Sequence, residues 1–363
     1  MNNIIPIEYY TNFYYQFFLM VVAMVILHCL VLEISDKKNI VFINFIGYVS
    51  LFFTVFYMGL RPIHDVFVDM TMYAHTFERF KENNPVKIYG DYGFFNMLER
   101  SAKIMSAENF FFLCATLYVI PVFYLSKKWF KEYWFYCFLI LVVSFSFWAY
   151  GTNGIRNGLA TSFFLLALTF YDKKIVLFSI MLLASSFHKT MLLPSLAYIL
   201  VLMHNSPKTY LKAWFFSILL SLLFGNLFVE LFANLGFEDS RIDLYFTDDI
   251  DESLTKTGFR WDFLIYSATG VFAGWYYIFK KGFNDKLYIQ LFNIYLIANA
   301  FWVLVIRANF SNRFAYLSWF MLGVVIIYPL LKEELMKNQH KVIGGILAIY
   351  FAFTYLMNVI LVK

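Results

Sequence analysis

Residues 13–33 read FYYQFFLMVVAMVILHCLVLE, and residues 39–60 read NIVFINFIGYVSLFFTVFYMGL. Each stretch is close to the length of about 20 apolar residues that carries an α-helix across a bilayer. The turn between them contains Lys37 and Lys38, whereas Glu8 precedes the first stretch. Because cytoplasmic loops are enriched in basic residues, this asymmetry predicts that the N-terminus lies outside. The two stretches therefore predict a membrane-embedded helical hairpin.

The composition extends this prediction to the whole chain. Of its 363 residues, 61% are hydrophobic and only 15% are charged, and the mean hydropathy is +0.65. Soluble domains have about 25% charged residues, so the apolar excess here requires a lipid environment. The N-terminal residues lack the basic region of a secretory signal, so we expect the first apolar stretch to be retained as a helix.

Cysteine and charge exclude two other classes of function. The three cysteines lie inside apolar runs and show neither metal-ligand spacing nor a disulfide framework. The net charge is +5, and its basic residues are spread over short loops rather than clustered, so nucleic-acid binding is not expected.

The hydropathy pattern predicts an all-α, polytopic helical bundle with about 10–12 transmembrane segments in a single domain, 1–363. The long apolar run 174–203 is interrupted at 185–189, and we expect two short segments there rather than one long tilted helix. One long helix would leave the later lysine-rich loops on the wrong side of the membrane. Ten segments are predicted after the first hairpin, at 108–126, 131–150, 156–171, 174–187, 190–203, 213–233, 262–279, 287–306, 314–331 and 342–361.

The connecting loops alternate in composition. Every second loop is rich in lysine and contains no arginine, as the positive-inside rule requires of cytoplasmic loops. Both termini are therefore expected outside, together with two larger loops near 61–107 and 236–260. The first should contain amphipathic helices near 72–79 and 96–105, where apolar residues recur with helical spacing. The second is acidic and is expected to be a solvated lid.

Several polar residues fall at the predicted outer ends of the apolar segments, although they are far apart in the sequence. Several cations on one face repel one another, by about 4 kcal/mol for two unit charges 4 Å apart at an effective dielectric of about 20. A diphosphate would reverse this sign, and arginine forks would add directional hydrogen bonds. The residues are Arg61, Asp69, Tyr73, Arg156, His188, Lys189, Arg307, Asn312 and Arg313.

Each of these residues also has a simpler interpretation. Arg61 and Arg307 could extend to the headgroups from helix ends, Asp69 could pair with Arg61, and Arg313 could cap its own helix. His28 is expected to be a bonded histidine inside the bundle. The histidines that we expect in loops are His64, His75, His204 and His340.

At these positions the chain resembles the EpsG family of Wzy-type polysaccharide polymerases. That family commonly shows an arginine before an Asp-Thr-x-x-Tyr box, an Arg-x-Gly-x-Ala segment, a His-Lys pair and a late arginine before an aromatic span. Here Met70 stands where threonine is usual. The corresponding segments are Gly59-Leu60-Arg61, Asp69-Met70-Thr71-Met72-Tyr73, Arg156-Asn157-Gly158-Leu159-Ala160, Phe187-His188-Lys189-Thr190 and Asn312-Arg313-Phe314-Ala315-Tyr316.

The resemblance implies a metal-independent glycosyltransferase without cofactors, with a fold similar to the O-antigen ligases and the wider GT-C enzymes. Such enzymes lie in the bacterial inner (cytoplasmic) membrane with the active site facing the periplasm or the outside. They transfer a growing glycan from undecaprenyl diphosphate to a sugar hydroxyl of a new lipid-linked repeat unit. Their partners are therefore both lipid-linked oligosaccharides, the bilayer and a separate chain-length co-polymerase. The resemblance leaves three products open: O-antigen, as part of lipopolysaccharide, capsule or exopolysaccharide.

This interpretation assigns a role to each candidate residue. Either His188 or Asp69 would accept the proton of the attacking hydroxyl, and His188 is favoured because an ordinary histidine pKa of about 6.5 suits a base at neutral pH. Four cations would bind the donor diphosphate, and three residues would bind the acceptor sugar or support the site. The cations are Arg156, Arg307, Arg313 and Lys189; the other three are Arg61, Tyr73 and Asn312. No metal ligands are predicted.

Three other functions are compatible with the sequence. An O-antigen ligase would use the same chemistry with a lipid A core as acceptor. A membrane O-acyltransferase would also place a histidine in apolar surroundings. A lipid-linked oligosaccharide flippase would be a transporter, and the break at 185–189 is a weak match to the broken helices of transporters.

Overall fold

The computed structural model describes residues 5–234, 258–308 and 311–361, and these residues form helices and turns without any strand. The predicted acidic loop 236–260 lies almost wholly outside the described residues. The helices group into two compact units, Met1–Lys189 with Leu330–Lys363 and Thr190–Pro329. We call them unit 1 and unit 2 and describe each by itself. Whether they fold as one domain, as the sequence led us to expect, stays a prediction.

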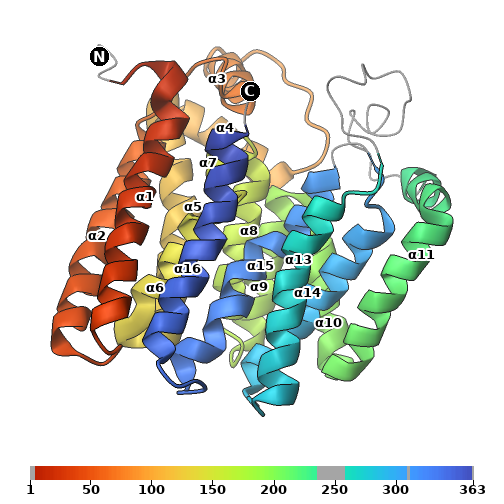
Figure 1. Ribbon diagram of the computed structural model, residues 1–363. Helices are drawn as coiled ribbons and strands as arrows, with labels where there is room; N and C mark the ends of the chain where they lie inside the picture. Colours follow the sequence, from red (N-terminus) through yellow and green to blue (C-terminus); the bar gives the residue numbers. More distant parts are fainter. Residues whose placement is uncertain (1–4, 235–257, 309–310, 362–363) are drawn as a thin grey trace. The chain divides into compact units, whose positions relative to one another are not determined.

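Unit 1 contains the N-terminal half of the chain and its last helix (Figure 1). Short 3₁₀ turns at 131–133 and 189–191 follow two of its helices, and a π-helical turn at 356–360 extends the last one. Its α-helices are α1 (Ile7–Val31), α2 (Lys37–Gly59), α3 (Val68–Lys81), α4 (Tyr92–Ala102), α5 (Ala107–Phe130), α6 (Trp134–Val142), α7 (Phe147–Thr152), α8 (Ile155–Leu168), α9 (Lys174–Phe187) and α16 (Gln339–Tyr355).

Unit 2 contains the helices between the end of α9 and the end of α15. The long helix α11 has a non-helical residue, Phe224, in its interior (φ −130°, ψ 23°), and a π-helical turn at 276–280 extends α13. The helices are α10 (Leu192–Met203), α11 (Pro207–Asn234), α13 (Trp261–Trp275), α14 (Lys286–Leu304) and α15 (Ser311–Lys332), the last of which ends in unit 1.

Seven helical stretches of the described chain are long and apolar enough to cross a membrane. At 1.5 Å per residue, about 20 residues cover the hydrocarbon thickness of about 30 Å. This confirms the predicted fold class, a polytopic helical membrane protein. The stretches are Ile7–Val31, Lys37–Gly59, Ala107–Val142, Pro207–Leu231, Lys286–Leu304, Ser311–Lys332 and Gln339–Ile360, and three shorter apolar helices are Ile155–Leu168, Lys174–Phe187 and Lys189–Met203.

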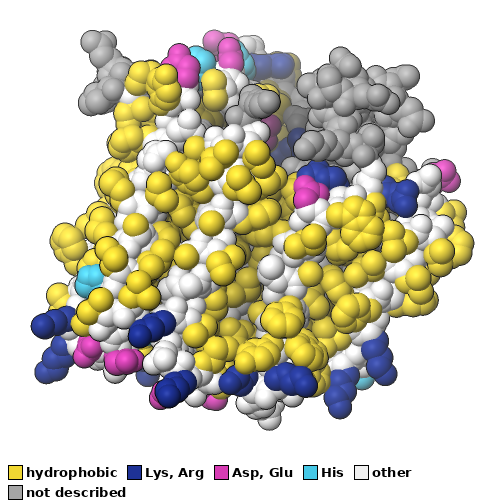
Figure 2. Space-filling view, viewed as in Figure 1, with side chains coloured by type: hydrophobic (Ala, Val, Ile, Leu, Met, Phe, Trp, Pro, Cys, Tyr) yellow, Lys and Arg dark blue, Asp and Glu magenta, His cyan; other side chains and the backbone are white. Residues whose placement is uncertain are grey.

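The lateral surface has the apolar character that lipid contact requires. Figure 2 shows hydrophobic side chains along the sides of the helices, with dark blue basic side chains at the lower edge of α1, α2 and α16. Large apolar side chains are exposed along these helices, including Leu27 and Ile349, which are 63% and 76% exposed. Such side chains would be unfavourable in water, at about 25 cal/mol per Å² of apolar surface, and are stable in lipid.

The interruption predicted at 185–189 is present. Helix α9 ends at Phe187, His188 has an extended backbone (φ −154°, ψ 119°), and a 3₁₀ turn leads into α10. The prediction of two short segments is thereby confirmed. The predicted continuous segment 131–150 is wrong in detail, because the chain turns between α6 and α7. There the N–H of Phe147 bonds to the carbonyl oxygen of Ser144 at 3.1 Å instead of continuing the α-helical pattern.

The amphipathic helices expected in the 61–107 loop are α3 and α4. Both lie across the end of unit 1 at which α1 begins and α16 ends (Figure 1). Their apolar faces meet α5 through buried aromatic rings: the centroid of Phe110 lies 5.6 Å from Phe77 and 6.0 Å from Phe94. The loop is therefore a packed helical layer at the end of the unit.

The opposite end of unit 1 is held together by a buried polar network around His340, which the sequence led us to place in a loop. His340 is 1% exposed and lies in the first turn of α16. Its Nδ1 lies 2.6 Å from the carbonyl oxygen of Leu32, and its Nε2 lies 2.6 Å from the Tyr136 hydroxyl. That hydroxyl also donates to Oδ1 of Asn39 at 3.1 Å. The network therefore connects the end of α1 with α2, α6 and α16.

Candidate functional site

Unit 1 has two ends that differ in their cations. We call them the arginine end, where Arg61 and Arg156 lie together with lysines such as Lys189, and the lysine end, where the lysine-rich loops lie. At the lysine end, the Lys332 ammonium donates to the carbonyl oxygen of Trp129 at 2.6 Å, which joins the end of α15 to the end of α5. At the other end, Nη2 of Arg61 donates to the carbonyl oxygen of Thr152 at 3.2 Å, which joins the end of α2 to the end of α7. Helices α8 and α9 then place Arg156 and His188 at this arginine end.

Arg61 is a buried cation that donates hydrogen bonds to the C-terminal ends of two helices, α2 and α7. Its side chain is 3% exposed, and Nη1 donates to the carbonyl oxygen of Met58 at 2.5 Å, in the last turn of α2. A cation at the C-terminal ends of helices α2 and α7 is favoured by their dipoles. Burial lowers the pKa of the Arg61 guanidinium to about 10, so it remains charged at neutral pH. Two roles were predicted for Arg61, binding the acceptor sugar or supporting the site, and these contacts fit the supporting role.

Asp69 and Tyr73 occupy the first two turns of α3. The N–H of Asp69 donates to Oδ1 of Asn153 at 3.2 Å, which ties the start of α3 to the turn between α7 and α8. Tyr73 is 1% exposed, and its ring packs 4.9 Å from that of Phe94. The predicted acidic and aromatic residues of this box therefore lie beside the segment that leads to Arg156.

Helix α8 begins with an unusually close backbone approach that fixes the position of Arg156. A side chain at Gly158 would overlap the backbone carbonyl of Tyr150. Only glycine allows α8 to lie this close to α7, which gives the Arg-x-Gly-x-Ala segment a physical reason. The first turn of α8, with Arg156, is thereby held at the arginine end.

Arg156 forms a largely buried ion pair that the sequence did not predict. Its Nη1 lies 2.7 Å from Oδ2 of Asp91, and the two side chains are 17% and 7% exposed. The guanidinium also lies over the rings of Tyr73 and Phe95, at 5.8 and 5.6 Å from their centroids. The sequence offered only the Gly90-Asp91 turn before α4 as a sign of this carboxylate, and such turns are common.

His188 and Lys189 form the break between α9 and α10, beside the same carboxylate. The N–H of Lys189 donates to Oδ1 of Asp91 at 3.0 Å. Helix α4 approaches α9 closely here, since a side chain at Gly93 would overlap the Ser186 hydroxyl. The structure therefore brings Arg156, His188 and Lys189 together around Asp91, whereas the sequence placed them only on the same face.

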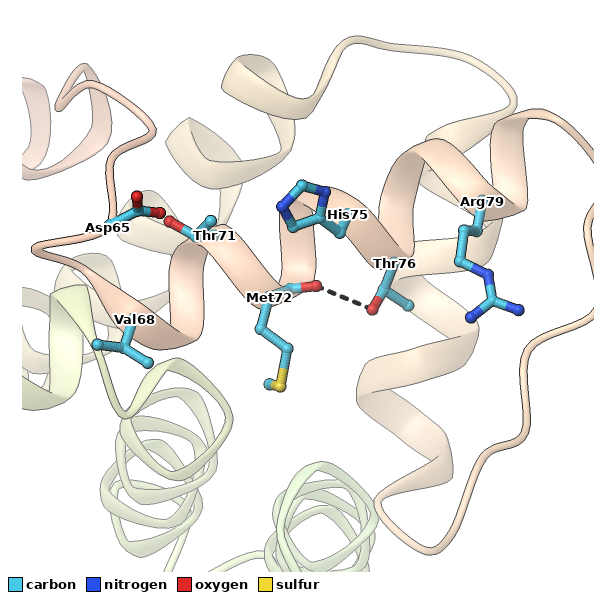
Figure 3. Close-up of a pocket in the computed structure, with 7 residues that line it drawn as sticks. All are labelled: Asp65, Val68, Thr71, Met72, His75, Thr76 and Arg79. Atoms are coloured by element: carbon cyan, nitrogen blue, oxygen red, sulfur yellow. Dashed lines mark hydrogen bonds between the residues drawn. The ribbon is translucent and has the colours of Figure 1, made fainter.

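An open groove runs along the exposed face of α3, with a volume of about 580 Å³. Figure 3 shows Asp65 and Val68 at one end of the row, Met72 in the middle and Arg79 at the other end. The volume lies within the range of about 300–1,000 Å³ that is typical of small-molecule sites. The groove combines an apolar floor with hydrogen-bonding side chains; its lining is Asp65, Val68, Thr71, Met72, His75, Thr76 and Arg79.

Unit 2 contributes the remaining predicted residues. Arg307 lies in the turn after α14, and Asn312 and Arg313 are exposed in the first turn of α15. The Arg307 side chain packs against α11, because a side chain at Gly225 would lie 2.7 Å from its Cδ and Nε. The interior irregularity at Phe224 precedes this glycine. Arg307 thus lies just after the end of α14, and Arg313 lies in the first turn of α15.

Within the parts of the chain that the structure describes, no three His, Cys, Asp or Glu side chains are grouped closely enough to hold a metal ion. The three cysteines are buried and unpaired by disulfides. Metal independence stays a prediction that needs a direct test.

Comparison with known proteins assigns the chain to a family. The profile of the EpsG family matches residues 44–363. The chain belongs to the EpsG family. Searches of curated proteins and of solved structures found no match.

Family membership indicates a glycosyltransferase-type polymerase of polysaccharide repeat units in a multi-pass membrane protein. The matched region includes all nine predicted site residues. Their individual roles, the lipid-linked donor and the side of the membrane are subjects of the proposal that follows.

Proposed function

We propose that this EpsG-family protein polymerises undecaprenyl diphosphate-linked repeat units at the outer face of the bacterial inner membrane. The observation that carries the proposal is the position of Arg156, at the start of α8 beside the His188–Lys189 break. A helix N-terminus with an arginine and a lysine suits a diphosphate. In unit 1 this group lies at the end opposite Lys332, and the positive-inside rule assigns the lysine end to the cytoplasm.

The reaction is a substitution at the anomeric carbon of the donor glycan. A hydroxyl oxygen of the acceptor sugar forms a new bond to that carbon, and the bond from the carbon to the diphosphate oxygen breaks. The undecaprenyl diphosphate leaves with the electron pair. His188 accepts the hydroxyl proton in this proposal, and Asp69 is the alternative base or orients the acceptor.

The cations stabilise the negative charge that develops on the leaving diphosphate. Arg156 and Lys189 supply this charge in unit 1. The diphosphate-binding role of Arg307 and Arg313, which lie in unit 2, stays a prediction from the sequence. Loss of one such positioned donor typically costs about 10²–10³ in rate. The proposal needs no metal ion, because the positive charge comes from side chains.

We assign the acceptor repeat unit to the groove on α3. This groove offers Asp65, His75 and Arg79 as hydrogen-bonding partners for sugar hydroxyls, with Met72 as an apolar contact for a sugar ring. Asp69 lies on the same helix, in the turn beside the groove. A separate chain-length co-polymerase would act on this protein without taking part in the chemical step.

The test is a chain-length assay in cells that depend on this protein for surface polysaccharide. Arg156→Ala and His188→Ala are expected to abolish the ladder of polymer lengths while single repeat units remain on their acceptor. Glu99→Gln is the matched control, since it alters only an exposed pair with Lys103 on α4. A normal ladder from Arg156→Ala would contradict the proposal.

The same assay separates the related functions. Free lipid-linked polymer that is not transferred to a lipid A core would indicate an O-antigen ligase. Loss of repeat units from the outer face would indicate a flippase. An unchanged polysaccharide that lacks acyl groups would indicate an O-acyltransferase.

A further inference from the structure

The Asp91 carboxylate contacts both Arg156 and the segment that forms the His188–Lys189 break. One carboxylate oxygen, Oδ2, lies 2.7 Å from Nη1 of Arg156, and the other, Oδ1, accepts the N–H of Lys189 at 3.0 Å. The carboxylate is thus shared between α8 and the segment that follows α9. The two oxygens of one carboxylate thus serve two partners from the start of α4.

The backbone at Asp91 shows that these distant contacts replace a local one. Asp91 is the N-cap residue of α4, where an aspartate side chain normally accepts an N–H of its own helix. Here no side-chain cap bond is made, and the residue has a left-handed backbone (φ 50°, ψ 38°) after Gly90 (φ 74°). Left-handed residues other than glycine are uncommon and concentrate at functional sites. The turn therefore directs the carboxylate away from α4 and toward Arg156.

Burial restricts the orientation of the Asp91–Arg156 ion pair. The Asp91 side chain is 7% exposed, so its charge is stable only while Arg156 stays beside it. Arginine has several rotatable bonds, and a carboxylate on one side and the Tyr73 and Phe95 rings on the other restrict them. Without Asp91, the guanidinium would lose the contact that fixes its direction.

We propose that Asp91 is a positioning residue that orients Arg156 toward the diphosphate and holds the His188–Lys189 segment against α8. The role rests on the proposed function, because it presumes that Arg156 binds the donor diphosphate. Asp91 does not itself contact the substrate, since a carboxylate would repel a diphosphate.

The test measures polymerisation by the full-length protein in lipid vesicles, with purified undecaprenyl diphosphate-linked repeat units. Asp91→Asn is expected to lower kcat about 10²-fold, the cost of misplacing a catalytic group by about 1 Å, and to raise KM for the donor. Asp91→Glu keeps the charge and is expected to retain more of the rate. Glu99→Gln on the same helix should behave as wild type.

The double variant Asp91→Asn/Arg156→Lys distinguishes positioning from general support of the fold, because Arg156→Lys keeps a cation and a measurable rate. If Asp91 acts mainly through Arg156, the double variant loses less rate than the product of the two single losses. Losses that multiply independently, equal losses in the Glu and Asn variants, or a wild-type rate from Asp91→Asn beside an inactive Arg156→Ala would each overturn the role. A wild-type rate from Arg156→Ala would overturn the proposed function itself, and the role of Asp91 with it.

Discussion

Single residues decide how the candidate site is built, and some of them could be predicted from the sequence. Arg61, Asp69, Arg156 and His188 were predicted on one face because the lysine-rich loops fix the direction of every helix. Within unit 1 the structure confirms that they share one end. The partner of Arg156 could not be predicted, since Asp91 lies 65 residues away in a loop whose course depends on tertiary packing.

Gly158 offers a test of the close packing behind Arg156. Gly158→Ala would force a side chain against the Tyr150 carbonyl, and overpacking of this kind costs about 1–3 kcal/mol. We expect a lower unfolding temperature in detergent and a shorter polymer ladder. Gly345→Ala is the matched control, because nothing lies within 4 Å of the added carbon. Equal behaviour of the two variants would show that the approach of α8 to α7 is unimportant.

The groove on α3 is tested by filling it. Met72→Trp would occupy the middle of the groove (Figure 3), and we expect KM for the acceptor to rise about tenfold, which corresponds to about 1.4 kcal/mol of binding. The KM for the donor should change little. Kinetics in vesicles with each substrate varied in turn measure both values, and an unchanged acceptor KM would remove the groove from the proposal.

At the scale of the helices, the sequence was most informative where hydropathy and charge agree. The first hairpin, the break after Phe187 and the amphipathic helices α3 and α4 were all predicted correctly. The turn that divides 131–150 was missed because residues 134–150 contain no charged residue, glycine or proline that would mark it. The buried position of His340 was missed because its partners, Tyr136 and Leu32, are distant in the sequence.

The His340 network predicts a specific loss of stability at the lysine end of unit 1. His340→Ala would leave the Tyr136 hydroxyl and the Leu32 carbonyl without this partner in a buried setting, which costs about 1–3 kcal/mol. Thermal unfolding in detergent measures the change. His204→Ala should shift stability by less than about 0.5 kcal/mol, because His204 is exposed. A similar small shift for His340→Ala would show that the network is not stabilising.

At the scale of the whole molecule, the proposed side of the membrane follows from the positive-inside rule, applied to the lysine-rich loops at the lysine end of unit 1. The native cysteines are buried, so single cysteines introduced at exposed positions report sidedness. A membrane-impermeant thiol reagent added outside intact cells should label Glu99→Cys on α4 and spare Lys38→Cys in the first turn of α2. The reverse labelling would invert the topology and place the arginine end in the cytoplasm.

The division into two units could not be foreseen from hydropathy, because both units contain long apolar helices. The family match likewise covers most of the chain rather than one motif, since it runs over residues 44–363. The proposed reaction is therefore tested on the whole protein.

The most direct measurement is polymerisation by the purified protein in vesicles that contain only undecaprenyl diphosphate-linked repeat units and a metal chelator. We predict polymer growth, with one undecaprenyl diphosphate released for each glycosidic bond formed, and neither product with Arg156→Ala. Repeat units that remain single in the presence of the wild-type protein, or polymer that forms equally well with Arg156→Ala, would contradict the account.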